Sequence, residues 1–419
     1  MTSPAALAAA RAVRPDRLAA RLAAMAEIGR APIGGVCRLA LSAEDARARA
    51  LLCDWAAARG WATFTDAIGN LFVRRPGTED SLPPVLIGSH LDSQPTGGNY
   101  DGVYGVLAAF EALEALEEAG IRTRHPLECV AWTNEEGARF QPGCMGSAAF
   151  AGAIPLATLL ASRDKAGTAV ADALPAVHAL APAMPERPLG FPVAGYIEIH
   201  IEQGPRLEAE GRTIGVVTGI QGARWFTVEV FGEEAHAGTT PVANRKDALQ
   251  AALDMIHALR ELMHDPDDVV RCTVGRMEVF PGAPNTVPGR VLFTIDFRHP
   301  DAETVRRLGD AVEPTLRAQL GPCTMTLAET FKTAPVDFHP AVVGLIDSAA
   351  EALGLPRLSL PSGANHDAKF LAEVCPSGMI FIPCLRGISH NPAEYASPED
   401  CTAGARVLAA AAADLALPA

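Results

Sequence analysis

The stretch Gly88-Ser-His-Leu-Asp-Ser-Gln-Pro-Thr-Gly-Gly-Asn-Tyr-Asp-Gly102 is a glycine-rich loop between two regular elements. It follows an apolar run, Val85–Ile87, which is typical of a buried strand, and it precedes a segment whose pattern predicts a helix. His90, Asp92 and Asp101 therefore lie on a loop at the carboxyl end of a strand, where open α/β sheets bind their ligands. Histidine and aspartate are metal-ligand types, but an ordinary polar turn has the same composition. The loop alone leaves both interpretations open.

Length, charge and cysteine content restrict the class of protein. A chain of 419 residues is too long for one compact core, so two domains are expected. The net charge is -14, which argues against nucleic acid or an anionic membrane as the main partner. The nine cysteines are scattered and include no C-x-x-C pair, which favours a reducing cytoplasm over a disulfide framework. Arginines interrupt the Ala-rich N-terminus, which predicts a helix and not a signal peptide, with an Arg-rich transit peptide as the alternative.

Two further segments place charged or imidazole side chains at strand ends. The apolar run Leu127–Thr133 leads into Asn134-Glu-Glu-Gly137, where adjacent carboxylates repel each other and lose hydration. A bound cation would offset that cost, and a solvated glutamate pair is the alternative. In Gly195–Gly204 three isoleucines alternate with Glu198, His200 and Glu202, so the three polar groups share one face of a strand.

The middle of the chain has a different pattern of apolar and polar residues. The segments Arg224–Phe231 and Arg290–Arg298 alternate as strands with one buried face, and a helix is predicted from Pro241, capped by Thr240, to about Met263. We therefore expect an α+β domain with an antiparallel sheet at residues 214–330. It would be inserted into an α/β domain, residues 1–213 and 331–419, that has a mixed, mostly parallel sheet flanked by helices.

Four predicted strand ends together offer metal-type side chains. These side chains are His90, Asp101, Glu135 or Glu136, His200 and His390. Three imidazoles and two carboxylates suit a pair of borderline divalent ions such as Zn²⁺ or Mn²⁺, and a bridging carboxylate would hold such ions about 3.5–4 Å apart. Asp92 is placed to orient the His90 ring from outside the ligand set.

Seven motifs now match a known family. They are Gly88–Ser93, Pro95–Gly102, Thr133–Gly137, His200–Pro205, His236–Pro241, Pro281–Thr286 and Gly387–Glu394. With them the chain resembles the metal-dependent amidohydrolases of the M20 peptidase clan. It is most similar to the hydantoinase/carbamoylase branch of N-carbamoyl-L-amino-acid hydrolases, β-ureidopropionases and allantoate amidohydrolases. The resemblance extends from Gly35 to Tyr395.

The resemblance implies a role for each metal-type residue. His90 and His200 would bind one ion, Glu136 and His390 the other, and Asp101 would bridge both. Zn²⁺ is the first expectation, with Mn²⁺, Co²⁺ or Ni²⁺ as alternatives. Glu135 would be the general base in hydrolysis of the ureido C–N bond of N-carbamoyl amino acids.

The resemblance also implies substrate contacts and assembly. The expected substrate contacts are Gln203, Asn285, Arg298 and Ser389, with His236 stabilising the developing oxyanion. A homodimer through the inserted lid domain is expected. The resemblance leaves open whether His236, Asn285 and Arg298 act within their own subunit or across the dimer. Allantoate is the alternative substrate, and a catalytically silent binding homologue is a further alternative. Asn365 and Cys384 depart from the family pattern near the substrate pocket.

Overall fold

The computed structural model describes residues 1–180 and 184–417, so residues 181–183 and 418–419 of the predicted catalytic domain lie outside the described residues. The chain divides into two compact units, one of residues 1–219 and 337–419 and the other of residues 220–336. The first junction follows residue 219, and not 213 as the sequence suggested, because strand β6 (Ile214–Ile220) pairs with strand β16 (Ser377–Ile382) of the larger unit.

The larger unit is built on a nine-stranded sheet. Its strands are β1 (Ala62–Thr65), β2 (Leu71–Arg75), β4 (Leu127–Trp132), β3 (Val85–His90), β5 (Gly195–Ile201), β16, β6 and β14 (Val336–Asp337) in spatial order, with β15 (Arg357–Ser362) paired to β6. The four central strands β4, β3, β5 and β16 are parallel, whereas β1, β2 and β6 pair antiparallel with their neighbours. This confirms the predicted mixed sheet, whose parallel strands end at one edge.

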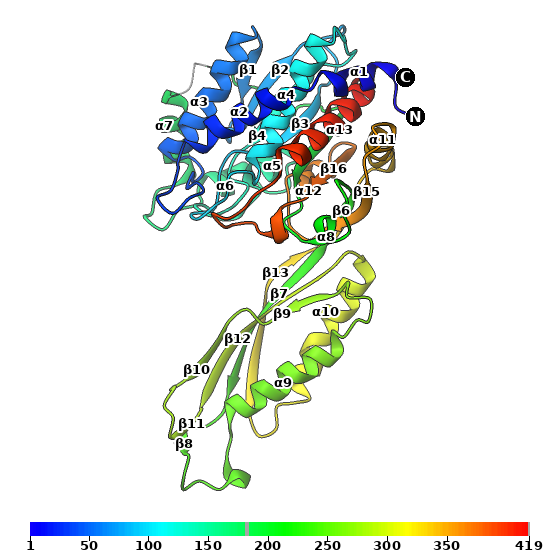
Figure 1. Cartoon of the computed structure of the whole chain (residues 1–419). Helices are drawn as coiled ribbons and strands as arrows, with labels where there is room; N and C mark the ends of the chain where they lie inside the picture. Colours follow the sequence, from blue (N-terminus) through cyan, green and yellow to red (C-terminus); the bar gives the residue numbers. More distant parts are fainter. Residues whose placement is uncertain (181–183, 418–419) are drawn as a thin grey trace. The chain divides into compact units, whose positions relative to one another are not determined.

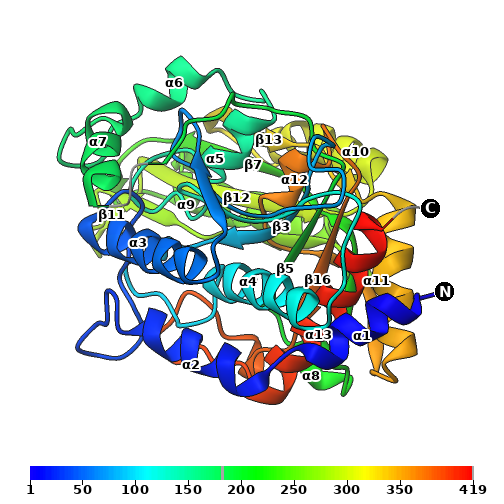
Figure 2. The same ribbon diagram turned by 90° about the horizontal axis from the view of Figure 1, so that it is seen from above.

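Helices cover this sheet (Figure 1). The longer ones are α1 (Pro4–Ala12), α2 (Pro15–Ala26), α3 (Ala43–Ala58), α4 (Val103–Glu118), α7 (Val170–Leu180), α11 (Pro340–Ala352) and α13 (Pro398–Ala416), and the short ones are α5 (Met145–Phe150), α6 (Leu156–Leu160), α8 (Arg206–Ala209), α12 (Ala368–Leu371) and the 3₁₀ turn η2 (Leu385–Gly387). Figure 2 shows α4 beside α13, and the two helices pack together over strands β3 and β5. Because α4 is buried over most of its length, it fixes the position of the loop that precedes it.

The smaller unit is an antiparallel sheet with two helices, as predicted. Its strands are β7 (Gly222–Phe231), β9 (Arg271–Thr273), β10 (Met277–Phe280), β12 (Arg290–His299) and β13 (Thr324–Thr333), with a separate pair of β8 (Ala235–His236) and β11 (Thr286–Val287). Phe293, Ile295 and Phe297 of β12 are buried while their neighbours are partly exposed. The buried face packs against α9 (Ala248–Leu262) and α10 (Ala302–Arg317), which lie on the same side of the sheet (Figure 1).

Helix α9 begins later than the sequence suggested. Pro241 opens no α-helix, since residues Val242–Asn244 form only a 3₁₀ turn, η1. The Asp247 side chain accepts hydrogen bonds from the backbone N–H groups of Leu249 and Gln250, at 3.0 and 3.1 Å, and so caps the helix at Ala248. The prediction of an N-cap at Thr240 was wrong because Pro241 and Arg245, which flank η1, have extended ψ angles of 146° and 143° and so separate Thr240 from the helix.

All nine cysteines are free thiols. Within the part of the chain that the structure describes, no helix combines the length and the apolar character that crossing a membrane requires.

Candidate metal centre and active site

Asp101 lies at the meeting point of two groups of metal-type side chains. The first group is His90, Asp101 and His200, and the second is Asp101, Glu136 and His390. Within each group the potential ligand atoms all lie within 4.8 Å of one another. His90 ends β3, His200 lies near the end of β5 and Glu136 follows β4, so the parallel strands bring them to the same edge of the sheet. The loop after β16 adds His390.

The two carboxylate oxygens of Asp101 face different groups. Oδ1 lies 3.5 Å from Nε2 of His90 and 3.1 Å from Nε2 of His200. Oδ2 lies 3.4 Å from Nε2 of His390, and it also accepts hydrogen bonds from Gln203 Nε2 at 2.8 Å and Ser389 Oγ at 2.7 Å. Asp101 is only 7% exposed. One oxygen for each group is the arrangement that a bridging carboxylate requires.

The two buried imidazoles point their Nε2 atoms at Asp101. Nδ1 of His90 is 2.9 Å from the backbone oxygen of Asp92, and Nδ1 of His200 is 2.8 Å from that of Ile201. Since a carbonyl only accepts, Nδ1 carries a proton in both rings, and in the neutral form of each ring Nε2 is the nitrogen with the lone pair. Nε2 of His90 is buried without a hydrogen-bond partner in the described structure. Such a lone pair fits a metal ion, and its second nitrogen is oriented in the way that metal-binding histidines are.

Asp92 contacts the site through both its backbone and its carboxylate. Its backbone oxygen orients His90, whereas its carboxylate oxygen Oδ1 lies 3.8 Å from Nδ1 of that ring. The carboxylate instead accepts hydrogen bonds, both 3.2 Å long, from the backbone N–H groups of Glu135 and Glu136. Asp92 therefore fixes both the first histidine and the turn that carries the glutamate pair.

Buried acidic groups crowd this edge of the sheet. Burial, together with the neighbouring carboxylates of Asp367 and Glu136, raises the pKa of Glu135 well above its usual value. Burial and the charge of Asp101 raise the pKa of Glu136 to about 8. Burial alone would raise the pKa of Asp101, but the imidazoles of His200 and His90 hold it well below its usual value. Divalent cations would relieve this crowding, so charge and donor type both fit a metal pair.

Glu135 lies beside the two groups without belonging to either. Its Oε2 is 3.4 Å from Nε2 of His90, and its Oε1 accepts a hydrogen bond from the Cys144 thiol at 3.4 Å. Glu136, in contrast, turns toward His390, at 3.4 Å, and is held by Gln94, which donates to both of its carboxylate oxygens. The two adjacent glutamates thus have different surroundings, which suits a base and a ligand.

Two of the predicted substrate contacts belong to this cluster. Gln203 and Ser389 both donate to Oδ2 of Asp101, and Gln203 Nε2 is also 3.4 Å from Nε2 of His390. The structure therefore places them against the Asp101 carboxylate. His390 is half-exposed, and both it and Gln203 have positive φ angles, 54° and 56°, a backbone strain that is common at functional sites.

The other three predicted substrate contacts belong to the smaller unit. Nδ1 of His236 accepts hydrogen bonds from the backbone N–H groups of Gly238 and Thr239, at 3.0 and 3.2 Å. In the neutral ring the proton is then on Nε2, which makes this exposed imidazole a donor. Asn285 lies beside it, since its backbone oxygen accepts from Ala237 N–H at 3.0 Å.

The third, Arg298 on β12, forms an ion pair with Asp296 at 2.8 Å. Both side chains are partly exposed, so the guanidinium keeps access to solvent. The pairing with a carboxylate of its own strand was not anticipated.

The sequence reasoning missed Glu394. Its Oε1 accepts hydrogen bonds from the backbone N–H groups of Tyr100 and Asp101, at 2.8 and 3.0 Å, and its Oε2 is 3.2 Å from Ser389 Oγ. Burial and the charge of Asp101 raise its pKa to about 7. Glu394 therefore ties the His390 loop to the Asp101 loop. Its place in the motif Gly387–Glu394 was the signal that could have found it.

Arg38 was missed as well. It is 1% exposed and donates to three backbone oxygens, those of Leu91 at 2.6 Å, Ile28 at 2.8 Å and Met25 at 3.1 Å. Because Leu91 stands between His90 and Asp92, this buried guanidinium fixes the start of the metal loop. A single arginine in a sequence gives no sign that it will be buried.

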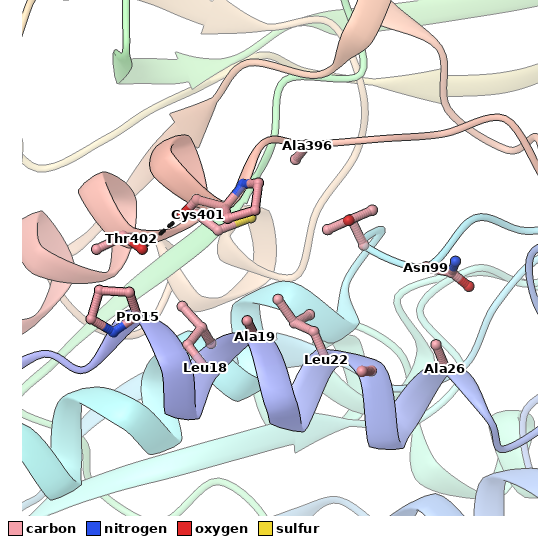
Figure 3. A pocket seen from close by; sticks show the side chains of 12 residues that line it. Pro15, Leu18, Ala19, Leu22, Ala26, Asn99, Ala396, Cys401 and Thr402 are labelled. Carbon is pink, nitrogen blue, oxygen red and sulfur yellow. Dashed lines mark hydrogen bonds between the residues drawn. The ribbon is translucent and has the colours of Figure 1, made fainter.

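A cavity of about 170 Å³ lies elsewhere in the larger unit and includes none of the metal-type residues. Figure 3 shows one face of α2, with Leu18, Ala19 and Leu22, turned toward Cys401 and Thr402 at the start of α13. Its lining is almost entirely apolar and carries no charged side chain. This cavity therefore offers none of the metal-type side chains that gather around Asp101.

Comparison with known proteins agrees with this geometry. The sequence pattern of the family described as Peptidase family M20/M25/M40 matches residues 86–414 of this chain. These residues include both metal-type groups. The chain belongs to this family.

Relatives of this M20-family chain are similar over nearly their whole length. It is 40% identical to the N-carbamoyl-L-amino acid amidohydrolase of Geobacillus stearothermophilus, over 94% of this chain and 97% of that protein. It is 36% identical to the allantoate amidohydrolase of Escherichia coli K12, over 92% and 94%. A crystal structure of a hydantoinase/carbamoylase family amidase from Burkholderia multivorans has a TM-score of 0.92 and 43% identity, over 97% and 98%.

Proposed function

We propose that the protein hydrolyses the ureido C–N bond of N-carbamoyl amino acids to give the amino acid, CO₂ and ammonia. The observation that carries the proposal is Asp101, whose two oxygens face two separate groups of metal-type side chains beside a glutamate that neither group uses. The similarity to N-carbamoyl-L-amino acid amidohydrolases supports the choice of substrate class.

The two groups would hold a pair of divalent ions. His90 and His200 would bind the first, Glu136 and His390 the second, and Asp101 both. We assign Zn²⁺ first, and Mn²⁺, Co²⁺ or Ni²⁺ as alternatives, since imidazole and carboxylate donors suit all of these ions. Bound ions lower the pKa of a water molecule and polarise a carbonyl group, which is the chemistry that amide hydrolysis needs.

The remaining steps fall to side chains of this chain. Glu135 takes a proton from the attacking water and returns it to the leaving nitrogen, so one carboxylate acts first as base and then as acid. The Nε2–H of His236 donates to the oxyanion that develops on the ureido carbonyl. Arg298 offers two parallel N–H groups to the substrate carboxylate, with Gln203, Asn285 and Ser389 as further polar contacts.

We further propose that the smaller unit acts as a lid and dimerisation domain and that the protein is a homodimer. The family resemblance supports this, as does the content of the unit, which carries His236, Asn285 and Arg298 but no member of either metal-type group. Binding residues on one unit and metal ligands on the other would require a closing movement for catalysis. Sedimentation that finds only monomer at micromolar concentration would overturn the dimer.

Allantoate hydrolysis is the second candidate, favoured by the similarity to the allantoate amidohydrolase of Escherichia coli. Allantoate also carries a carboxylate and ureido groups, so the same cluster would serve. A catalytically silent homologue is less well supported, because all five metal-type residues and Glu135 are present and assembled.

A substrate panel separates these functions. Metal-loaded protein is assayed for ammonia release from several N-carbamoyl-L-α-amino acids, N-carbamoyl-β-alanine and allantoate. We expect the highest kcat/KM with an N-carbamoyl-L-α-amino acid. A preference for allantoate would favour allantoate hydrolysis over the first candidate. If no compound is turned over in the presence of Zn²⁺, Mn²⁺ or Co²⁺, the protein would be a catalytically silent homologue.

A further inference from the structure

Cys144 places its side chain against one oxygen of the Glu135 carboxylate, and His90 lies beside the other. It precedes helix α5 and is 5% exposed. Its backbone is left-handed, with φ 49° and ψ 34°, a conformation that costs little only for glycine. A cysteine in this conformation is strained. Either a contact of its side chain offsets the strain, or a neighbouring function requires it.

The backbone around Cys144 is fixed independently of the thiol. Its N–H donates to the backbone oxygen of Glu135 at 2.7 Å, and the N–H of Met145 donates to that of Asn134 at 3.2 Å. These bonds bring the chain back along the Glu135 turn. Replacing the side chain alone therefore leaves the turn in place, which makes the role of the thiol separable from that of the backbone.

The thiol itself meets the carboxylate of Glu135. Sγ donates to Oε1 at 3.4 Å, a normal length for a sulfur donor, whereas Oε2 is turned toward Nε2 of His90 at 3.4 Å. Each oxygen of the carboxylate thus has a different neighbour. With Oε1 held, the carboxylate cannot rotate freely, and Oε2 stays on the side of the metal-type groups.

We propose that Cys144 is a positioning residue for Glu135: its S–H group anchors Oε1 so that Oε2 is the oxygen that receives the proton from water. The assignment of Glu135 as the base rests on the proposed function, whereas the thiol–carboxylate contact does not. A base held within a narrow range of orientations accelerates proton transfer without changing substrate affinity.

Three variants separate positioning from folding. Cys144→Gly relieves the left-handed strain and should unfold at the same temperature as the wild type or higher, yet its kcat should fall roughly tenfold with KM unchanged. Cys144→Ala should lose kcat to the same extent. Cys144→Ser carries the same backbone strain as the alanine variant but keeps a hydrogen-bond donor, so it should recover most of the lost turnover. Full turnover in the glycine variant would overturn the proposal.

An infrared measurement tests the contact without any substrate. The S–H stretching band of Cys144, isolated as the difference between the wild type and Cys144→Ser, should lie below that of a free thiol and move toward it in Glu135→Gln. A band at the free-thiol position, unchanged by Glu135→Gln, would refute the contact. A lowered band in a protein that hydrolyses no member of the substrate panel would instead refute the proposed function while supporting the contact.

Discussion

Replacing Arg38 by lysine should destabilise the larger unit by about 3 kcal/mol. The guanidinium donates from Nε to Leu91 O and from Nη1 to Met25 O and Ile28 O, and all three bonds are buried or partly buried. A lysine ammonium has one nitrogen at the end of a flexible stem and cannot reach carbonyls on two sides at once. Two of the three bonds are then lost, at about 1.5 kcal/mol each for a charged donor.

Burial adds to the loss of stability expected for a lysine at position 38. It already lowers the pKa of Arg38 to about 10, and an ammonium gives up its proton more readily when desolvated. The assay is thermal unfolding followed by circular dichroism, in which about 3 kcal/mol corresponds to a fall of roughly 6–12 °C in Tm. The matched control is Arg47→Lys, since Arg47 on α3 is 58% exposed and forms an ion pair with Glu44 on the same helix. This variant should unfold within about 0.5 kcal/mol of the wild type.

An Arg38→Lys variant as stable as the Arg47→Lys control would show that these buried hydrogen bonds do not stabilise the unit. Arg38→Lys should also hold metal less tightly than Arg47→Lys, because Leu91 separates His90 from Asp92. An unstable variant with unchanged metal affinity would mean that Arg38 supports the fold but not the loop.

Three further perturbations test the site. Glu135→Gln should lower kcat by about 10²–10⁴-fold while metal content stays that of the wild type, and full activity would remove Glu135 as the base. Asp101→Ala should reduce bound metal below two ions per chain and abolish turnover, and a variant that keeps two ions would show that Asp101 is no bridge. Glu394→Ala removes the acceptor of two backbone N–H groups on the Asp101 loop, so metal affinity should fall about 10–100-fold by equilibrium dialysis, and unchanged affinity would restrict Glu394 to a structural role.

The sequence predicted the site where local pattern and topology act together. A strand followed by a glycine-rich loop and a helix placed His90 and Asp101, and the period of two in β5 placed His200 on the polar face of its strand. Parallel strands then bring their carboxyl ends together, so residues far apart in the chain become neighbours without any further information. The family resemblance added the separate roles of Glu135 and Glu136.

The other features of the site depend on contacts between residues far apart in the sequence, which no local pattern predicts. Glu394 accepts from the N–H of Asp101 across 293 positions, and Arg38 reaches carbonyls on two different segments. The sequence placed Asp92 near His90 but could not show that its backbone oxygen contacts the ring while its carboxylate accepts from the N–H groups of the glutamate pair. Such choices depend on which partner is nearer in the folded chain.

The central claim is that Asp101 joins two metal sites that act together in hydrolysis. The most direct test is to strip the protein of metal, add Zn²⁺ or Mn²⁺ in increments, and follow ammonia release from an N-carbamoyl-L-amino acid against the number of ions bound per chain. We expect the rate to reach its maximum only when two ions are bound. A rate that is complete at one ion per chain, or that does not depend on added metal, would contradict it.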